Sequence, residues 1–307
     1  MAAMAIDSTL ELAYAPPYDW PAMISFLAAR AIPGVEVVEA GGYRRTIEID
    51  GRHGTIEVAP MSGRDALSAT IRFPNAGSLP AIVARIRRWF DLDADVATIA
   101  ERLAADELLA PLIAARPGLR VPGAWDGFEL AVRAVLGQQI SVAAARQLAG
   151  RLVAAHGEPL ALADTPPGLA AVFPRPSQLA TADLASLGMP GARARALESL
   201  AATVARDPRL FDPGSDLDGT VGRLKALPGI GDWTAQYIAM RALHEPDAFP
   251  AADLGLLRAM ADQAGRRPTP AELLERAEAW RPWRAYAAQH LWTTDAVHQP
   301  HRQEAVA

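Results

Sequence analysis

Hydrophobic and polar residues alternate in short runs near the start of the chain, and glycine-rich turns lie between these runs. The runs cover residues 35–39, 43–50, 55–58 and 69–73, and the turns fall at 41–42 and 51–54. Alternation with a period of two between tight turns predicts the hairpins of an antiparallel sheet. Apolar positions recur with helical spacing over 19–30 and 79–90, which predicts two helices beside the sheet. Residues 1–92 are therefore predicted to form an α+β domain.

Every periodic segment after residue 91 has helical spacing. Helices are predicted near residues 95–104, 106–115, 125–136, 141–155, 191–206, 217–226, 232–243, 254–264, 270–279 and 282–294. Proline and glycine residues separate these segments, as they do between helices. The whole chain is therefore predicted to have an α+β fold in which a small antiparallel sheet precedes a long all-α part.

Residues 224–235 predict two helices joined by a tight turn. Pro228 ends the first helix, and Gly229 and Gly231 allow backbone angles that side chains forbid. The second helix begins near Asp232, and its first N–H groups have no partner within the helix. These groups and the helix dipole can bind an anion, including a phosphodiester, without reading base sequence. For the turn alone, an ordinary connection between two packed helices is the alternative.

Composition narrows the class of protein. The chain has 307 residues, of which 50% are hydrophobic and 21% charged, enough for two or three globular domains. The lack of cysteine excludes disulfides, thiolate metal sites and iron–sulfur clusters, and it favours a reducing, cytoplasmic location. No signal peptide and no membrane span are predicted. The net charge of −5 weighs against nucleic acid, but a hairpin contact relies on backbone N–H groups more than on basic side chains.

Asp253 and several aromatic residues are candidates for chemistry. Asp253 precedes an apolar-periodic helix, where an N-cap is expected. A carboxylate fixed at a helix start can also face a developing positive charge, and the two roles are compatible. Trp233 and Tyr237 are four residues apart and share a helical face, and more aromatic residues, including Trp292, gather at 280–292. A helical aromatic stripe usually belongs to a core, and the alternative is the wall of a pocket for a flat ligand.

Together these features resemble the helix-hairpin-helix DNA glycosylases, and within that superfamily the bacterial 3-methyladenine DNA glycosylase II family. The similar segments occur in the same order along nearly the whole chain: residues 16–20, 26–30, 135–143, 227–235 and 283–287. The resemblance implies two all-α domains with the active cleft between them. One would comprise residues 93–120 and 247–307, and the other residues 121–246.

The resemblance also implies roles for single positions. It places Asp253 at the catalytic carboxylate and Gln139 at the wedge that enters the duplex gap. The walls of the base pocket would be Trp233, Tyr237, Trp292 and Phe26. The phosphate contact would comprise Leu227, Gly229, Ile230 and Gly231. Gln139 departs from the apolar wedge of the family, although a glutamine can fill the gap and bond the orphaned base. No cofactor and no catalytic metal are implied, apart from a monovalent cation that relatives often hold at the hairpin.

The implied activity is that of a monofunctional, monomeric glycosylase of base excision repair. It would hydrolyse the N-glycosidic bond of alkylated purines, such as 3-methyladenine and 7-methylguanine, in double-stranded DNA. Bifunctional relatives use a lysine nucleophile two residues after the second hairpin glycine, where this chain has Trp233, so direct hydrolysis is favoured. The sequence leaves open whether Asp253 is a general base or an electrostatic stabiliser. The alternatives are a non-catalytic helix-hairpin-helix DNA-binding protein and a bifunctional oxidised-base glycosylase.

Overall fold

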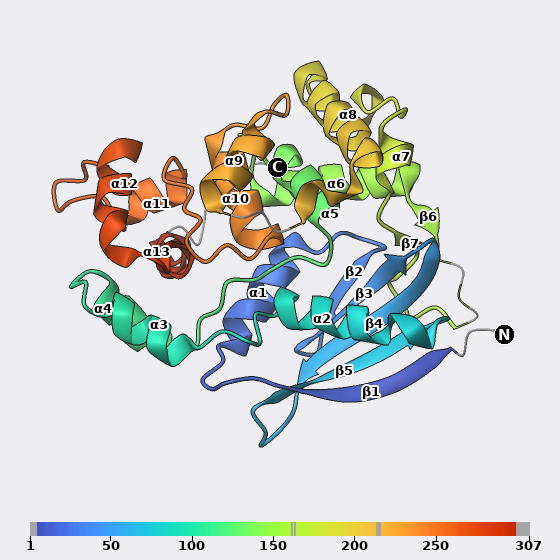
Figure 1. The fold of residues 1–307 in the computed structure, drawn as a ribbon, viewed down its shortest axis with the longest axis horizontal. Helices are drawn as coiled ribbons and strands as arrows, with labels where there is room; N and C mark the ends of the chain where they lie inside the picture. The colour runs from blue at the N-terminus through green and yellow to red at the C-terminus, as the bar shows by residue number, and fades with distance from the viewer. Residues whose placement is uncertain (1–4, 161, 163, 213–215, 299–307) are drawn as a thin grey trace.

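The sheet and the helices form adjoining parts of the molecule (Figure 1). The computed structural model describes residues 5–160, 162, 164–212 and 216–298, with side chains up to residue 294. The strands of the main sheet are β1 (Ile6–Ala13), β2 (Glu36–Glu39), β3 (Gly42–Ile49), β4 (Arg52–Pro60) and β5 (Ala66–Phe73). They pair antiparallel in the order β1-β5-β4-β3-β2. A second, two-stranded ladder joins β6 (Glu158–Pro159) to β7 (Ala171–Val172).

Two details of the sheet differ from the sequence prediction. The edge strand β1 was not predicted, and β4 begins at Arg52 within the segment predicted as a turn. The turn between β3 and β4 is limited to Asp50 and Gly51, which both have positive φ. Gly54 lies inside β4, where a Cβ atom would come within 2.4 Å of the carbonyl oxygen of Arg72 on β5. This glycine therefore permits a close approach between strands and does not form the turn.

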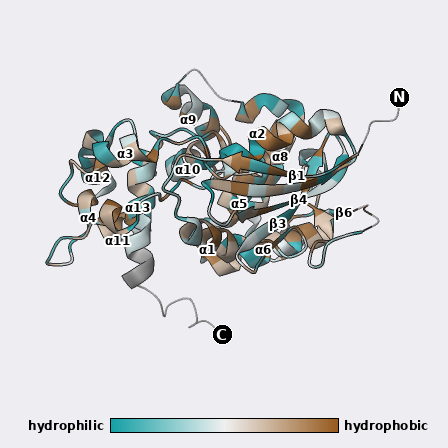
Figure 2. Ribbon diagram, turned by 90° about the horizontal axis from the view of Figure 1, so that it is seen from below, coloured by the Kyte–Doolittle hydropathy of each residue, from teal (hydrophilic) through white to brown (hydrophobic). Residues whose placement is uncertain are grey.

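Helices α1 (Trp20–Arg30) and α2 (Leu79–Trp89) cover the sheet and share its core. Asp19 caps α1 as predicted, because its side chain accepts a hydrogen bond from the Ala22 amide at 3.0 Å. The core includes Tyr43, whose ring meets that of Trp89 edge-on at 4.9 Å. Figure 2 shows hydrophobic residues on the strands and on α1, which lies against them.

The rest of the described chain is mainly helical. The further helices are α3 (Val96–Leu103), α4 (Leu109–Ala115), α5 (Gly127–Leu136), α6 (Val142–His156), α7 (Pro176–Leu179), α8 (Gly191–Arg206), α9 (Leu217–Lys225), α10 (Asp232–Ala242), α11 (Leu254–Ala259), α12 (Pro270–Ala277) and α13 (Arg284–His298). Helix α13 packs against both α11 and α4, although α4 is far away in sequence (Figure 1). The α+β fold class is confirmed, whereas the domain limits at residues 92, 120 and 246 stay a prediction. Among the described helices, none combines the length and the apolar character that a bilayer span requires.

A buried ion network joins the sheet to α5. The Arg45 guanidinium on β3 donates to Glu129 on α5 at 2.6 Å, and Arg133 donates to Glu36 at 2.6 Å. Burial alone would raise the pKa of Glu129, but the neighbouring Arg45 and Arg133 outweigh this effect and lower it. The network leaves each buried charge with an opposite partner. The position of α5 relative to the sheet therefore depends on charges that cannot separate without a large desolvation cost.

Asp91 links the end of the first domain to the last helix. One of its carboxyl oxygens, Oδ2, accepts hydrogen bonds from the Tyr286 hydroxyl at 2.9 Å and from the Val121 amide at 3.3 Å. Burial raises the pKa of Asp91 to about 7, although these two donors and Arg120 oppose the rise. Folding therefore favours the protonated, neutral form of this carboxyl group.

Substituting Asp91→Asn should flatten the pH dependence of stability. The folded-state pKa is raised, so the contribution of Asp91 is fully present below its unfolded pKa and is lost as the pH rises through about 7. Asparagine stays neutral and can place its carbonyl oxygen at the Oδ2 position. From pH 4 to pH 8, the unfolding free energy of the wild type should fall by about 2–4 kcal/mol relative to the variant. Urea unfolding at both pH values measures this difference, and parallel pH profiles would contradict the assignment.

Candidate functional site

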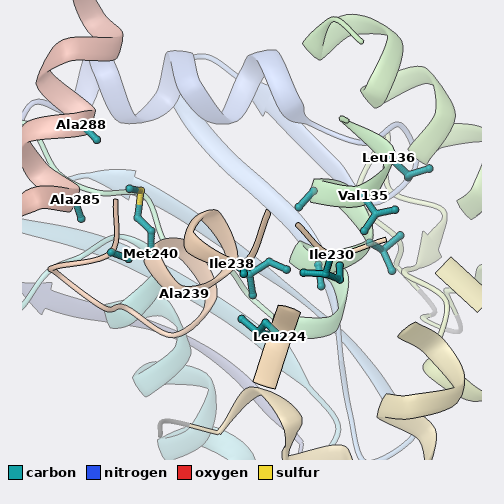
Figure 3. Packing of buried hydrophobic residues seen from close by; sticks show 14 of the residues in the cluster. Val135, Leu136, Leu224, Ile230, Ile238, Ala239, Met240, Ala285 and Ala288 are labelled. Carbon is teal, nitrogen blue, oxygen red and sulfur yellow. The ribbon is translucent and has the colours of Figure 1, made fainter. Parts of the chain in front are cut away.

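The predicted hairpin connects α9 to α10. Gly229 has a φ of 78°, and a Cβ atom there would lie 2.5 Å from the Cβ of Ala196 on α8. Glycine is therefore required at this position by both backbone angle and space. Ile230 is 5% exposed and anchors the turn in the core shared by α5, α9 and α10 (Figure 3). The Ile230 amide closes the turn by donating to the Leu227 carbonyl at 3.1 Å.

The start of α10 presents backbone donors toward solvent. Gly231 is the N-cap and has no side chain to satisfy the first amides of the helix. Gly229, Gly231 and Asp232 are exposed, so an oxygen anion can approach these amides. Lys225 at the end of α9 is held in an ion pair with Asp232 at 2.9 Å.

Gln138, which sequence reasoning did not identify, ties the hairpin to the end of α5. Its side-chain amide donates to the Gly229 carbonyl at 2.9 Å and to the Thr234 hydroxyl at 3.0 Å. The backbone carbonyl of Gln138 accepts a hydrogen bond from the Arg193 guanidinium at 2.5 Å. The next residue, Gln139, is exposed and has a φ of 61°. Gln138 therefore sets the position of the hairpin relative to the exposed side chain of Gln139.

Four N–H groups converge on the carboxylate of Asp253, the N-cap of α11. Oδ1 accepts from the amides of Gly255 at 2.8 Å and Leu256 at 3.1 Å, and from the Trp292 indole at 2.8 Å. Oδ2 accepts from the Trp233 indole at 2.8 Å. The carboxylate therefore makes contacts with α10, α11 and α13. The predicted N-cap geometry is present, and it coexists with contacts from two of the predicted aromatic residues.

The two indole rings that donate to Asp253 both pack on the ring of Tyr237. Trp233 and Tyr237 are stacked, with their ring centroids 5.2 Å apart and an interplanar angle of 8°. Trp292 meets Tyr237 nearly edge-on at 6.4 Å. All three side chains are only partly buried. The structure thus brings Trp233, Tyr237 and Trp292 together beside Asp253, and we call these three rings the aromatic wall.

Phe26 lies against two guanidinium groups, and its place in the wall of a base pocket stays a prediction. Its ring carries the guanidinium of Arg30 at 3.7 Å and that of Arg241 at 4.4 Å from its centroid. A ring covered by two guanidinium groups has at most one face left for a base. Arg241 connects Phe26 to the aromatic wall, because it also donates to the Tyr237 hydroxyl at 2.7 Å. Neither arginine was identified from the sequence, where both resemble ordinary helical residues.

Comparison with known proteins identifies the class that this fold and hairpin define. Residues 132–285 match the HhH-GPD superfamily of base excision DNA repair proteins, and residues 9–126 match the AlkA N-terminal domain. The chain is 38% identical to DNA-3-methyladenine glycosylase 2 of Escherichia coli over 290 residues, which cover 92% of this chain and 96% of that protein. The chain therefore belongs to the HhH-GPD superfamily, in the AlkA-type family that includes the Escherichia coli protein.

Two further relatives extend the comparison. The chain is 42% identical to the probable bifunctional transcriptional activator/DNA repair enzyme AlkA of Mycobacterium tuberculosis, over 97% of this chain and 60% of that protein. It thus spans about 60% of the length of this relative. The structure of a 3-methyladenine DNA glycosylase from Archaeoglobus fulgidus superposes with a TM-score of 0.80, at 24% identity, over 95% of this chain and 99% of the other. This likeness confirms the fold.

The two hairpin glycines should respond differently to substitution by alanine. Gly229→Ala should lower the free energy of unfolding by about 2–4 kcal/mol, because it adds left-handed backbone strain to a clash with Ala196. Gly231→Ala is the matched control: its φ is −83° and a Cβ atom would meet nothing within 4 Å. It should stay within about 1 kcal/mol of the wild type. Equal losses in urea unfolding would contradict the geometry of the turn.

Proposed function

We propose that this protein is a monofunctional DNA glycosylase that hydrolyses the N-glycosidic bond of alkylated purines in double-stranded DNA, as a step of base excision repair. The observation that carries the proposal is the carboxylate of Asp253 beside the aromatic wall. The family membership and the name of the Escherichia coli relative support it. A cytoplasmic location and a monomeric state are part of the same proposal.

DNA would be held by backbone groups and opened by a side chain. The exposed amides at the start of α10 suit a phosphate, and this contact needs no base sequence. The target purine has to leave the duplex, because its glycosidic bond cannot be reached in the stack. Gln139 would fill the gap, since its exposed side chain lies directly after the residue that bonds to the hairpin. The flipped purine would then stack on the aromatic wall.

The two oxygens of Asp253 would have different tasks. Oδ1 already accepts three hydrogen bonds, whereas Oδ2 accepts one from Trp233 and keeps a second lone pair in the carboxylate plane. Oδ2 would therefore face the sugar carbon or the attacking water. When the glycosidic bond breaks, the sugar becomes oxocarbenium-like, and a fixed negative charge stabilises it. The indole donors hold the carboxylate in place before the reaction starts.

Direct hydrolysis suits the described residues better than a lyase reaction. The position of the lysine nucleophile in bifunctional relatives holds Trp233, whose indole is bonded to Asp253. Lys225 is engaged with Asp232 on the hairpin. The reaction would need no organic cofactor. If a monovalent cation binds at the hairpin, the carbonyls of Leu227 and Gly229 would be its oxygen ligands, because each accepts a hydrogen bond and keeps a second lone pair.

Substituting Asp253→Asn should abolish base release and preserve DNA binding. Asparagine retains an oxygen for the N-cap bonds but has no negative charge for the sugar. We expect single-turnover release of 7-methylguanine to fall at least about 1,000-fold, while affinity for an abasic-site duplex stays within about threefold. Asp262→Asn is the matched control, because its carboxylate also accepts backbone amides, from Ala264 and Arg266, in a turn. Normal release by Asp253→Asn would refute the catalytic role, and a wild type that binds DNA without releasing bases would favour the non-catalytic alternative.

A pair of Gln139 variants separates the wedge from backbone strain. Both Gln139→Ala and Gln139→Gly remove the side chain, and both should weaken retention of an abasic-site duplex by about tenfold. Only the glycine variant relieves the positive φ, so only it should raise the unfolding free energy, by about 1 kcal/mol. Dissociation rates and urea unfolding measure the two effects. Unchanged dissociation in both variants would remove Gln139 from the duplex.

A further inference from the structure

Two exposed apolar side chains lie in the loop that follows the hairpin anchor Gln138. Among the residues that the structure describes, the large hydrophobic side chains that remain exposed are Ile140, Val142, Leu254 and Leu274. Ile140 and Val142 are 36% and 38% exposed, and only one residue separates them. A single exposed hydrophobic residue is ordinary, whereas neighbouring ones can form a contact surface. We call Ile140 and Val142 the apolar pair.

The backbone keeps the apolar pair on one side of the loop. Ser141, which lies between the two residues, has an extended backbone with φ −70° and ψ 157°. The side chains before and after an extended residue leave the chain in the same general direction. The Ser141 hydroxyl accepts a hydrogen bond from the Ala144 amide at 3.2 Å and so caps α6. This cap fixes Val142 as the first residue of α6, and the apolar pair stays together.

The loop leads away from the hairpin. Gln138 donates to the Gly229 carbonyl, the exposed Gln139 follows, and the apolar pair comes next. Because an extended chain advances about 3.5 Å per residue, Val142 lies within about 11 Å of Gln139. The minor groove of B-DNA is about 6 Å wide. With the hairpin on one phosphate strand and Gln139 in the gap, the apolar pair would therefore reach the opposite strand.

The loop offers no charge to a phosphate. Residues 137–145 contain no charged side chain, and the guanidinium of Arg193 is bonded to the backbone carbonyl of Gln138. Apolar side chains instead suit the C–H edges of deoxyribose in the minor groove, where apolar wedges of DNA-bending proteins also enter. A ribose would place a 2′-hydroxyl against these side chains. A hydroxyl that is buried without a hydrogen-bond partner weakens binding.

We propose that Ile140 and Val142 contact the sugars of the strand opposite the target base and select deoxyribose over ribose in that strand. The inference rests on the proposed function only for the position of the duplex. It assigns to the loop a selectivity that phosphate contacts at the hairpin cannot supply, because DNA and RNA have the same phosphates. The expected partner is a duplex whose opposite strand is DNA, and an RNA opposite strand is disfavoured.

The first test measures dissociation constants of abasic-site duplexes by fluorescence anisotropy. Three duplexes differ only in the three opposite-strand sugars that face the abasic site, which are deoxyribose, ribose or 2′-fluoro-deoxyribose. The fluoro sugar adopts the pucker of ribose but has no hydroxyl group. Ribose should weaken binding of the wild type about tenfold, whereas the fluoro sugar should stay within about threefold of deoxyribose.

Two outcomes of this test would overturn the inference. Equal weakening by ribose and by the fluoro sugar would trace the preference to the shape of the duplex. Equal affinity for all three duplexes, or binding to none of them, would show that the loop does not select the sugar.

The second test uses variants of the apolar pair. Val142→Thr keeps the shape of valine and replaces one methyl group by a hydroxyl that can pair with a 2′-hydroxyl. It should reduce the preference for deoxyribose to about threefold, and Ile140→Thr should act in the same direction. Leu274→Thr is the matched control and should keep the full preference, because Leu274 is 42% exposed on α12, which lies apart from α5 and α6 (Figures 1 and 2). An unchanged preference in both loop variants would place the sugar contact elsewhere and refute the inference.

Base release separates this inference from the proposed function. Single-turnover release of 7-methylguanine is measured from duplexes with deoxyribose or ribose at the same three opposite positions. If the wild type releases the base and binds both duplexes equally, the proposed function stands and the inference fails. If binding shows the sugar preference but no base is released from either duplex, the proposed function fails and the sugar preference stands.

Discussion

The convergence of N–H donors on Asp253 is the constraint on which the arrangement of the helical part depends. The donors come from α11 itself, from Trp233 on α10 and from Trp292 on α13, so three helices must meet within hydrogen-bond distance of one side chain. A buried or half-buried carboxylate with fewer donors would be poorly compensated. The packing of α13 on α11 brings the Trp292 indole to the carboxylate of Asp253.

The sheet contributes to the site through a chain of contacts. Arg45 on the sheet holds Glu129 on α5, and Gln138 at the end of α5 holds the hairpin through the Gly229 carbonyl. The hairpin then fixes the start of α10 and with it Trp233. The sheet is therefore connected to the hairpin through α5, whose position the ion network holds.

The sequence predicted the elements with regular periodicity and missed those held by distant contacts. Strand β1 was missed because the exposed Ser8 occupies a position that alternation would make apolar. Asp253 and the aromatic wall were predicted because helix spacing and family resemblance both mark them. Gln138 and Arg241 were missed because their partners lie 91 and 119 residues away, and nothing local distinguishes such side chains from surface ones.

Positive charge is unevenly distributed over this protein. A net charge of −5 offers little general attraction for DNA, so the proposed phosphate contact relies on the neutral amides of the hairpin. Unbalanced positive charge occurs instead behind Tyr237, where Arg30 and Arg241 share the ring of Phe26. Under the proposed function, these charges lie near the rings on which a purine would stack and not at the proposed phosphate contact.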